Sequence, residues 1–491
     1  MTDNQRLWLA IALCLAYCAW VGFIIVSHYA RQRERRHVTT GAFIVAYASQ
    51  TGTAKQLAEY QAELLESDRP VKVIALNDLA IDTLRKANDA LFVVSTYGDG
   101  EPPDNGRRFY RALQQHNKQH NTALLQSLSY QVIALGDSQY PAFCAFGELL
   151  DVALQQSGAT AIAELEKIDR AQSQPLPGDA SQSAESSFKA STWRVTEQQQ
   201  LNSADGRELF MVTLDAEQAL PAWQAGDILD IQPHNANTAI AEWLNKHELN
   251  PDTVIAVEGT PTPLKLVLQT RQLTDLAGAG NKEQHILDMP LLPLRSYSIA
   301  SVPEEGQLKL MVRKQYHPDG TPGIGSGWLT TYAGSEEPFC ANVKDNPLCH
   351  IAQLDVPLVL IGAGSGLAGI RAQLAKRYYA NSDADIWLIY GEQSPQLDNV
   401  IPAAIEAWQM GFAGLKIQQA YSRGEPGQYV QDVMVAAADE LQNIIARGAH
   451  IYVCGSHQGM GQAVHQTFTD ILGEDALMQL IDEQRYHRDT Y

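Results

Sequence analysis

Cysteine is scarce in this sequence, and its few copies lack the spacing of a structural module. The six cysteines include no CxxC pair. Neither a zinc module nor a disulfide framework is therefore predicted, and a reducing compartment is expected. The 13 histidines form no HExxH motif and no paired-ligand spacing, so the sequence predicts no metal site.

Basic residues are also few. Lysine and arginine number 36 against 56 aspartates and glutamates, which gives a formal net charge of −20. Such an acidic surface repels nucleic acid and suits a basic partner. A hydrophobic fraction of 45% over 491 residues is typical of a folded chain and excludes a disordered one. At about 100–200 residues per domain, roughly three domains are expected.

Long hydrophobic runs are absent except for one near the N-terminus. Leu7 to Tyr29 contains no Asp, Glu, Lys or Arg, and a helix of that length crosses about 30 Å of hydrocarbon. One arginine precedes the run and four follow it, at positions 31, 33, 35 and 36. A cleaved signal carries its charge before the run, and a buried core helix is the other alternative. We predict a transmembrane anchor over residues 1–36, in the cytoplasmic (inner) membrane, with the rest of the chain in the cytoplasm.

A phosphate-binding turn is predicted after the first buried strand. Residues 42–49 are almost wholly apolar, as in a strand of a parallel sheet, and a helix is expected shortly after them. The intervening turn, SQTGTA, is rich in hydroxyl groups and small residues, which lets backbone N–H groups surround a phosphate. A simple helix cap is the alternative interpretation. The Walker pattern GxxxxGK(S/T) is absent, so a nucleoside triphosphate is not expected.

Two further strands lead into loops that carry a tyrosine. The strand at 90–96 precedes Tyr97, and the strand at 130–135 precedes a loop containing Tyr140. Ligands of open α/β sheets bind beyond the carboxyl ends of the strands. The phosphate turn and the two loops together predict a site for a flat ring carrying a phosphate, as in FMN. A surface-turn role is the alternative for either tyrosine alone.

The second half of the chain begins after a polar segment. Residues 171–191 are rich in Ser, Gln, Ala and Pro, and are predicted to be a flexible linker. Residues 193–233 alternate apolar and polar side chains, which favours an antiparallel barrel. The strand RSYSIAS places Arg295 and Tyr297 on one face and Ser298 on the other. The glycine-rich turn at 323–327 can open a helix towards a pyrophosphate.

A second nucleotide-binding turn follows the buried strand at 356–361. Its sequence, GAGSGL, matches the dinucleotide fingerprint GxGxxG except at the last position, which is Leu367. A glycine-rich turn between a strand and a helix still allows a pyrophosphate to meet backbone N–H groups. We therefore predict a dinucleotide site that includes Gly364 and Ser365.

Taken together, these motifs resemble the diflavin reductases, the NADPH–hemoprotein reductase family, and most closely its sulfite reductase flavoproteins. The segments SQTGTA, STYGDGEPPDN, LGDSQYPAFC, RSYS, GAGSG and RYHRDTY carry the resemblance. It implies a multidomain α/β fold: a flavodoxin-like doubly wound FMN domain at 40–170, then two ferredoxin reductase-like domains. These are an antiparallel β-barrel FAD domain at 192–350, with a shortened connecting insert, and an α/β NADPH-binding domain at 351–491.

The resemblance also implies roles for individual residues. The FMN phosphate would be held by Ser49, Gln50, Thr51, Gly52, Thr53 and Ala54. Tyr97 and Tyr140 would flank the FMN ring, which Gly98, Gly136 and Asp137 would line. FAD would be held by Arg295, Tyr297, Ser298, Gly323, Ile324 and Ser326. The 2′-phosphate of NADPH would be bound by Ser422, Arg423, Tyr429 and Gln431. The predicted catalytic residues are Ser298, Cys454 and Asp489, around the hydride path, and Tyr491, which would cover the FAD ring.

Three positions depart from the family pattern. Gly427 replaces a lysine, Gly369 replaces a proline and Ser456 replaces an aspartate. The first departure predicts a modest preference for NADPH over NADH.

The resulting hypothesis is a membrane-anchored reductase that passes electrons from NADPH to FAD, to FMN and to a one-electron acceptor. The acceptor would be a membrane-associated heme or iron protein, or a sulfite-reductase-like partner. The alternatives are the reductase component of a ferric or ferric-siderophore system, and a flavin-binding sensing or assembly module with little turnover.

Overall fold

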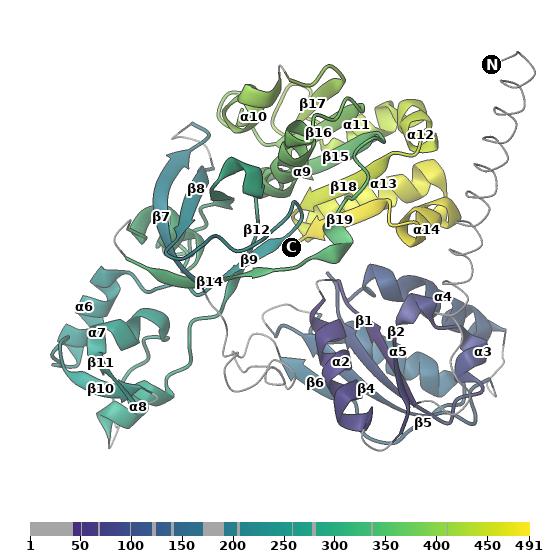
Figure 1. The fold of residues 1–491 in the computed structure, drawn as a ribbon, viewed down its shortest axis with the longest axis horizontal. Helices are drawn as coiled ribbons and strands as arrows, with labels where there is room; N and C mark the ends of the chain where they lie inside the picture. Colours follow the sequence, from purple (N-terminus) through teal and green to yellow (C-terminus); the bar gives the residue numbers. More distant parts are fainter. Residues whose placement is uncertain are drawn as a thin grey trace, which may run out of the picture. The chain divides into compact units, whose positions relative to one another are not determined.

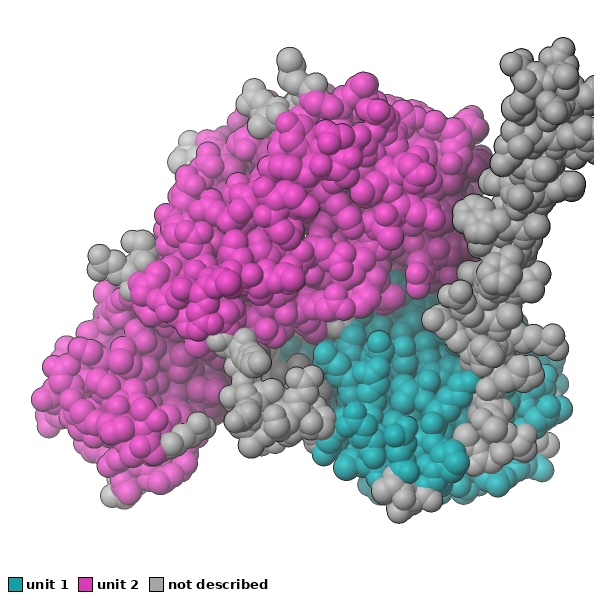
Figure 2. Space-filling view, in the orientation of Figure 1, with its two compact units in different colours: residues 1–169, 177–181 teal, residues 170–176, 182–491 magenta. Residues whose placement is uncertain are grey.

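The computed structural model describes residues 43–50, 52–66, 69–98, 100–119, 124–138, 142–169, 191–203, 207–257, 259–276, 281–334, 337–409 and 411–491. These residues form two compact units, shown in different colours in Figure 2. The first unit holds the described residues up to Asp169, and the second holds those from Ser191 onward. The predicted anchor at 1–36 lies outside the described residues. Within the residues that are described, no helix is both long and apolar enough to cross a membrane.

The first unit is built on a parallel sheet (Figure 1). Its strand order is β2-β1-β3-β4-β5, and β6 also pairs with β4. The strands are β1 (Phe43–Ala48), β2 (Val71–Ala75), β3 (Asp89–Ser95), β4 (Ser129–Gly136), β5 (Thr160–Ala161) and β6 (Glu166–Asp169). All of the pairs are parallel. The order reverses direction at β1 and β3, which is the switch point of a flavodoxin-like doubly wound fold.

The helices of the first unit connect these strands. They are α2 (Thr53–Glu66), η1 (Leu76–Asp78), α3 (Ile81–Leu84), α4 (Asp104–Lys118) and α5 (Ala145–Gln156). The middle strands β1 and β3 are buried along nearly their whole length, as their apolar sequences predict. The predicted phosphate turn follows β1 and the Tyr97 loop follows β3. Both therefore start at the switch point, where such sheets bind ligands.

An antiparallel barrel opens the second unit, in agreement with the sequence prediction. Its strand order is β12-β9-β14-β7-β8-β13. The strands are β7 (Ser191–Gln200), β8 (Leu209–Ala216), β9 (Ile228–Ile231), β12 (Arg295–Ser298), β13 (Leu308–Arg313) and β14 (Phe339–Lys344). A bridge between Ile299, directly after β12, and Leu310 of β13 joins the two ends of the sheet. Trp193, Leu229 and Trp328 lie in the core that the barrel encloses.

A small subdomain occupies the insert between β9 and β12 (Figure 1). It contains α6 (Asn237–Lys246), β10 (Val254–Val257), β11 (Thr260–Pro263), α7 (Leu264–Val267), η2 (Leu268–Thr270) and α8 (Lys282–Asp288). These elements share a core of their own that includes Trp243 and Leu268. Three short turns complete the barrel region: η3 (Pro303–Glu305), η4 (Trp328–Tyr332) and η5 (Pro347–Cys349).

The C-terminal part of the second unit is a five-stranded parallel sheet. Its order is β17-β16-β15-β18-β19. The strands are β15 (Leu358–Ala363), β16 (Ile386–Glu392), β17 (Leu415–Tyr421), β18 (His450–Gly455) and β19 (Tyr486–Thr490). The helices are η6 (Gly364–Gly366), α9 (Leu367–Tyr379), α10 (Ile401–Gln409), α11 (Val430–Ala436), α12 (Ala438–Ala446), η7 (His457–Gly461), α13 (Gln462–Leu472) and α14 (Glu474–Asp482).

Buried ion pairs join the barrel to this parallel sheet. Arg371 of α9 donates to the carbonyl of Ala300 at 2.6 Å and to both carboxylate oxygens of Glu305, at 2.9 and 2.7 Å. Arg313 of β13 pairs with Glu392 at the end of β16. Both pairs are almost fully removed from solvent. The barrel and the sheet therefore meet along a polar, geometrically fixed boundary.

Candidate functional site

The turn after β1 is shaped by a buried serine and a left-handed glycine. The Ser49 side chain is 3% exposed, and its Oγ accepts a hydrogen bond from the Ala54 backbone N–H at 3.1 Å. Gly52 has φ +83°, a conformation that favours glycine. The cap-like hydrogen bond of the alternative interpretation is therefore present, and the predicted phosphate role of Ser49 stays a prediction. Thr51 lies outside the described residues.

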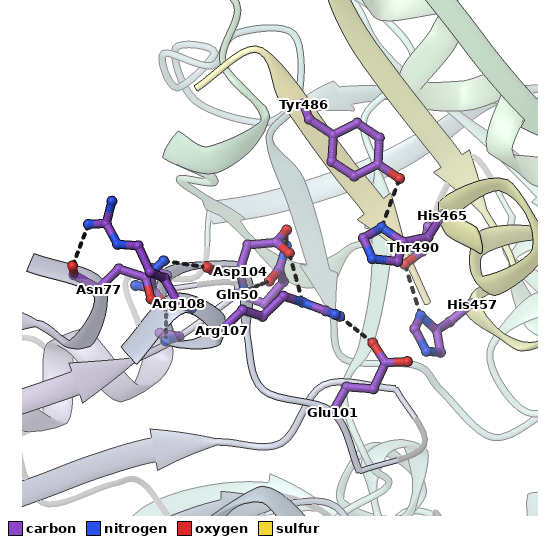
Figure 3. A network of polar contacts seen from close by, with 12 residues as sticks. Gln50, Asn77, Glu101, Asp104, Arg107, Arg108, His457, His465, Tyr486 and Thr490 are labelled. Atoms are coloured by element: carbon purple, nitrogen blue, oxygen red, sulfur yellow. Dashed lines mark hydrogen bonds and ion pairs between the residues drawn. The ribbon is translucent and has the colours of Figure 1, made fainter. Parts of the chain in front are cut away.

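Gln50 braces this turn against the start of α4. Its Nε2 donates to Asp104 Oδ2 at 2.9 Å, and the Asp104 N–H donates to Gln50 Oε1 at 3.0 Å, as Figure 3 shows. The Ser49 N–H donates to Asn105 Oδ1 at 2.9 Å. Asp104 and Asn105 were not predicted as site residues, although they end the STYGDGEPPDN segment. They hold the turn and the following loop in one arrangement.

The two ring-binding loops are only partly described. Tyr97 is buried, and its backbone exchanges two hydrogen bonds of 2.9 Å with Glu101. Gly98 adopts φ +54° between them. At Gly136, an added Cβ would lie 2.6 Å from the Cys144 nitrogen, so no side chain fits there. Asp137 follows it and is half-buried. Tyr140 lies outside the described residues, so the predicted pair of flanking tyrosines is not seen.

In the barrel, the predicted FAD residues and the glycine-rich turn lie against each other. A Cβ added to Gly325 would lie 2.6 Å from Arg295 Cγ and 3.0 Å from Tyr297 Oη. Arg295 and Tyr297 thus share one face of β12, as expected, and both meet the turn. Burial raises the pKa of Tyr297, and the nearby Arg295 opposes that rise. Gly325 was not predicted, although it lies between Ile324 and Ser326.

Backbone hydrogen bonds fix the glycine-rich turn in place. Ser326 Oγ accepts from the Gln315 N–H at 3.0 Å, and the Gly323 N–H donates to the Gln315 carbonyl at 2.8 Å. Ile324 is 37% exposed. The predicted helical segment follows directly as η4. Gly323, Ile324 and Ser326 therefore form the fixed rim beside Arg295 and Tyr297.

The dinucleotide turn passes very close to β18. A Cβ added to Gly366 would lie 2.0 Å from the Cys454 carbonyl oxygen. Gly364 has φ +59°, and its carbonyl accepts a hydrogen bond from Tyr390 Oη at 2.7 Å. Leu367 is fully buried. The close approach of helix and strand is therefore made at Gly366, which explains why a third glycine is not needed.

Three predicted catalytic residues meet beside this turn. Cys454 and Asp489 are paired neighbours on β18 and β19. Cys454 Sγ donates to Asp489 Oδ2 at 3.4 Å, and the Ser298 hydroxyl of β12 lies close enough to this carboxylate to lower its pKa. Burial, and then the charge of Asp489, raises the pKa of the Cys454 thiol well above its ordinary value. A neutral thiol is a poor nucleophile, so the cysteine acts here as a hydrogen-bond donor.

Tyr452 also contacts this group and was not predicted. Its Oη donates to Asp489 Oδ2 at 2.9 Å. The sequence signal was available, because Tyr452 and Cys454 are two residues apart on one strand and so share a face. Burial raises the pKa of Asp489, whereas the hydrogen bonds from Ser298, Tyr452 and Cys454 oppose that rise.

The C-terminal residue is anchored at the dinucleotide turn. Tyr491 Oη lies 2.7 Å from Ser365 Oγ. The backbone of Tyr491 donates to the Gly455 carbonyl at 3.1 Å and accepts from the His457 N–H at 2.8 Å. Its side chain is nevertheless 54% exposed. The chain end is thus held in place while its ring stays accessible.

The four residues predicted for the 2′-phosphate come from two neighbouring segments. Ser422 and Arg423 follow β17, whereas Tyr429 and Gln431 lie at the start of α11. The Gln428 N–H donates to the Tyr421 carbonyl at 2.9 Å and closes the loop between them. Arg423 and Tyr429 are exposed.

Gly427 in that loop is tightly packed. An added Cβ would lie 2.7 Å from the Ser422 carbonyl oxygen. The lysine that the family places here would therefore require the backbone to move.

Among the described residues, one group has the composition of a metal site: Asp227, Asp345 and His350. His350 Nε2 lies 2.6 Å from Asp227 Oδ1. The Asp227 carboxylate also accepts from the backbone of Asn346 at 3.0 Å and of Gln224 at 2.9 Å. Its oxygens are already engaged, so the group is interpreted as a structural His–Asp pair.

Comparison with known proteins identifies two of these regions. The family model for flavodoxin matches residues 45–183, and that for the oxidoreductase NAD-binding domain matches residues 360–466. The chain is a homologue of the diflavin reductases. Its matched domains confirm the predicted cofactors, which are FMN in the flavodoxin domain, and FAD and NADPH in the remainder.

The similar relatives are sulfite reductase (NADPH) flavoprotein alpha-components. The protein from Bacillus subtilis is 27% identical, with 91% of this chain and 89% of the relative covered. The protein from Vibrio vulnificus is 26% identical over 92% of this chain and 88% of its own length. The Shigella flexneri protein is 25% identical over 90% and 89%. The resemblance therefore spans nearly the whole of both chains.

Proposed function

We propose that this chain is a membrane-anchored diflavin reductase that transfers electrons from NADPH, through FAD and FMN, to a one-electron acceptor protein. The observation that carries the proposal is the meeting of Ser298, Cys454 and Asp489. They come from the barrel and from two strands of the parallel sheet, beside the dinucleotide turn. When bound, the nicotinamide and the flavins supply the hydride and electron transfer.

The residues present fit a dinucleotide and a flavin in the second unit. Gly366 leaves no room for a Cβ, and Gly325 lies against Arg295 and Tyr297. Such side-chain-free turns allow backbone N–H groups to approach a pyrophosphate. Arg423 would pair with the 2′-phosphate, because a guanidinium forms charge-assisted hydrogen bonds with a dianion.

Asp489 and the three side chains next to it, Ser298, Tyr452 and Cys454, are here called the Asp489 group. This group would hold and orient the reacting face of the nicotinamide. Asp489 accepts hydrogen bonds from Tyr452 and Cys454, and burial raises its pKa, so it can keep a proton longer than an exposed carboxyl. Cys454 stays neutral and adds no negative charge of its own. Ser298 ties the barrel side of the site to this carboxylate.

In the first unit, the fit rests on the turn after β1 and the loops after β3 and β4. Gly52 adopts a left-handed conformation that other residues rarely take, and Gly136 leaves no room for a Cβ. The brace from Gln50 to Asp104 would keep the phosphate turn fixed when the ring site is empty or filled.

The anchor and the acceptor rest on the sequence. An uncharged run with arginines after it supports a single span with the catalytic units in the cytoplasm. The acidic surface supports a basic acceptor. The chemical class proposed is a membrane-associated heme or iron protein, since such centres accept one electron at a time.

Anaerobic mixing of the full chain with NADPH tests the reductase proposal. Loss of flavin absorbance is expected, and acid should release both FMN and FAD. Asp489→Asn should slow the loss of absorbance, whereas Asp439→Asn, an exposed change on α12, should not. Unchanged absorbance in the flavin-loaded wild-type protein would favour the sensing or assembly alternative.

Membrane fractionation tests the anchor. Activity in the membrane fraction should resist salt washing and yield to detergent. A chain beginning at Thr39 should be soluble and should still reduce ferricyanide. An inactive but folded and flavin-loaded short chain would contradict the modular proposal.

A further inference from the structure

The side of α9 that faces Asp489 has no side chain where it comes closest. A Cβ added to Gly369 would lie 2.4 Å from Tyr452 Oη, 2.9 Å from Cys454 Sγ and 3.0 Å from Asp489 Oδ2. All three atoms belong to the Asp489 group. The hydroxyl of Tyr452 thus lies in space that any larger residue at position 369 would need.

Tyr452 is held in one position by this packing. Its side chain is fully buried, in the same core as Leu367 and Ile370 of α9. Tyr452 and Cys454 are two residues apart on β18, so their side chains lie on the same side of the sheet. The hydroxyl then has Asp489 Oδ2 as an acceptor at 2.9 Å.

We propose that Tyr452 is a positioning residue for the hydride site, and that Gly369 is the glycine that makes its position possible. The hydrogen bond from Tyr452 fixes the Asp489 carboxylate where Cys454 and Ser298 also reach it. The significance of this contact for hydride transfer rests on the proposed function.

The same contact opposes the rise in the pKa of Asp489. Burial raises the pKa of Asp489, while the donors Ser298, Tyr452 and Cys454 each lower it. The pKa of Tyr452 itself is raised well above 10 by burial and by Asp489, so its hydroxyl stays protonated and keeps donating. Loss of the Tyr452 hydroxyl removes one hydrogen-bond donor to the ionised carboxylate of Asp489. The carboxyl of Asp489 should then protonate at a higher pH.

The competing explanation is that Tyr452 only fills the core. Tyr452→Phe separates the two explanations, because it keeps the ring and removes only the hydroxyl. Tyr130→Phe is the matched control. Tyr130 is also a fully buried tyrosine on a parallel strand, and its Oη donates to Asp151 Oδ1 at 2.6 Å, but it belongs to the first unit.

The first measurement is an infrared titration of the full-length, flavin-loaded protein without NADPH. The Asp489 carboxyl band is assigned by subtracting the spectrum of Asp489→Asn. Its midpoint should rise by about one pH unit or more in Tyr452→Phe, as expected for losing one hydrogen bond to a charged group. Tyr130→Phe should leave the midpoint unchanged. An unchanged midpoint in Tyr452→Phe overturns the proposal.

The second measurement is NADPH oxidation with ferricyanide. Tyr452→Phe should lower kcat about tenfold while FAD content and the NADP⁺ dissociation constant stay at wild-type values, as expected for a residue that acts on the reacting geometry. A loss shared equally by Tyr130→Phe would indicate a general effect of buried tyrosine hydroxyls and overturn the proposal. A wild-type protein that oxidises no NADPH would refute the proposed function, whereas the infrared result would stand.

The Gly369 half of the proposal has its own test. Gly369→Ala should displace the Tyr452 hydroxyl and raise the Asp489 midpoint in the same direction. In the double variant with Tyr452→Phe, the kcat should fall little further than in either single variant, because both changes remove one contact. Fully additive losses in kcat would show that the two residues act independently, and would overturn their pairing.

Discussion

Gly366 offers the sharpest test of how the dinucleotide turn is built. Its φ of −60° is ordinary for a helix, so alanine meets no backbone strain there. The cost of Gly366→Ala is instead a clash. The new Cβ would lie 2.0 Å from the carbonyl oxygen of Cys454, 2.4 Å from its carbonyl carbon and 2.7 Å from Gly455 Cα. All three are backbone atoms and cannot rotate away.

Gly448, in the turn between α12 and β18, is the matched control. It has φ +92°, and an added Cβ would meet nothing within 4 Å. Gly448→Ala should therefore cost about 1–2 kcal/mol of backbone strain and nothing else. Overpacking at Gly366 should cost about 1–3 kcal/mol. The two variants should thus lose similar stability, one through a steric clash and the other through backbone strain.

Ligand binding separates the two variants. Gly366→Ala must push the turn away from β18, so NADP⁺ affinity measured by calorimetry should fall by at least tenfold. Gly448→Ala should bind NADP⁺ with wild-type affinity. Its urea unfolding midpoint should be similar to that of Gly366→Ala. Wild-type NADP⁺ affinity and stability in Gly366→Ala would refute the reasoning that this glycine makes the close approach.

Three further predictions concern other residues. Tyr491→Ala should bind NADP⁺ and NAD⁺ about fivefold more tightly, because the predicted stacking of the ring on the flavin, worth about 1 kcal/mol, would no longer have to be broken; unchanged constants would contradict this prediction. Arg423→Ala should raise the KM for NADPH by about tenfold or more and leave that for NADH unchanged, since a charge-assisted hydrogen bond is worth about 1.5–3 kcal/mol. Burial, with His487 next in importance, lowers the pKa of His450 from 6.5 to about 4. Between pH 6.5 and pH 4 the imidazole of His450 is protonated in the unfolded chain but stays neutral in the folded protein. The free energy of unfolding is therefore highest above pH 6.5 and decreases as the pH falls towards 4. Urea unfolding at pH 7 and pH 5 should show a loss of about 1 kcal/mol after allowance for screening by water, and His450→Gln should reduce it.

The elements that the sequence predicted well are those set by local pattern. The apolar run at 42–49, the turn after it and the alternation in RSYS each correspond to a strand or turn of the structure. The second nucleotide turn was also predicted, even though Leu367 breaks the fingerprint. The strand, the glycine-rich turn and the helix all lie within residues 358–379, so tertiary contacts have little to override.

The contacts that complete the sites were not predictable in this way. Gln50 and Asp104 are 54 residues apart, and Tyr452 and Asp489 are 37 residues apart. The sequence around a polar residue does not indicate which distant residue will be its hydrogen-bond partner. Gly369 shows the same limit. Its departure from the family's proline is visible in the sequence, but the hydroxyl that fills the space is visible only in the fold.

The buried ion pairs between barrel and parallel sheet explain how residues from separate elements stay aligned. Arg313 with Glu392, and Arg371 with Glu305, gain little net stability, because removing charges from water offsets most of their attraction. Their effect is on geometry, since leaving either charge alone in the interior would cost about 3–5 kcal/mol. Any sliding of the barrel against the sheet separates both pairs at once. Ser298 can therefore meet Asp489 across that boundary without a covalent link, and a hydride site can be built from two domains.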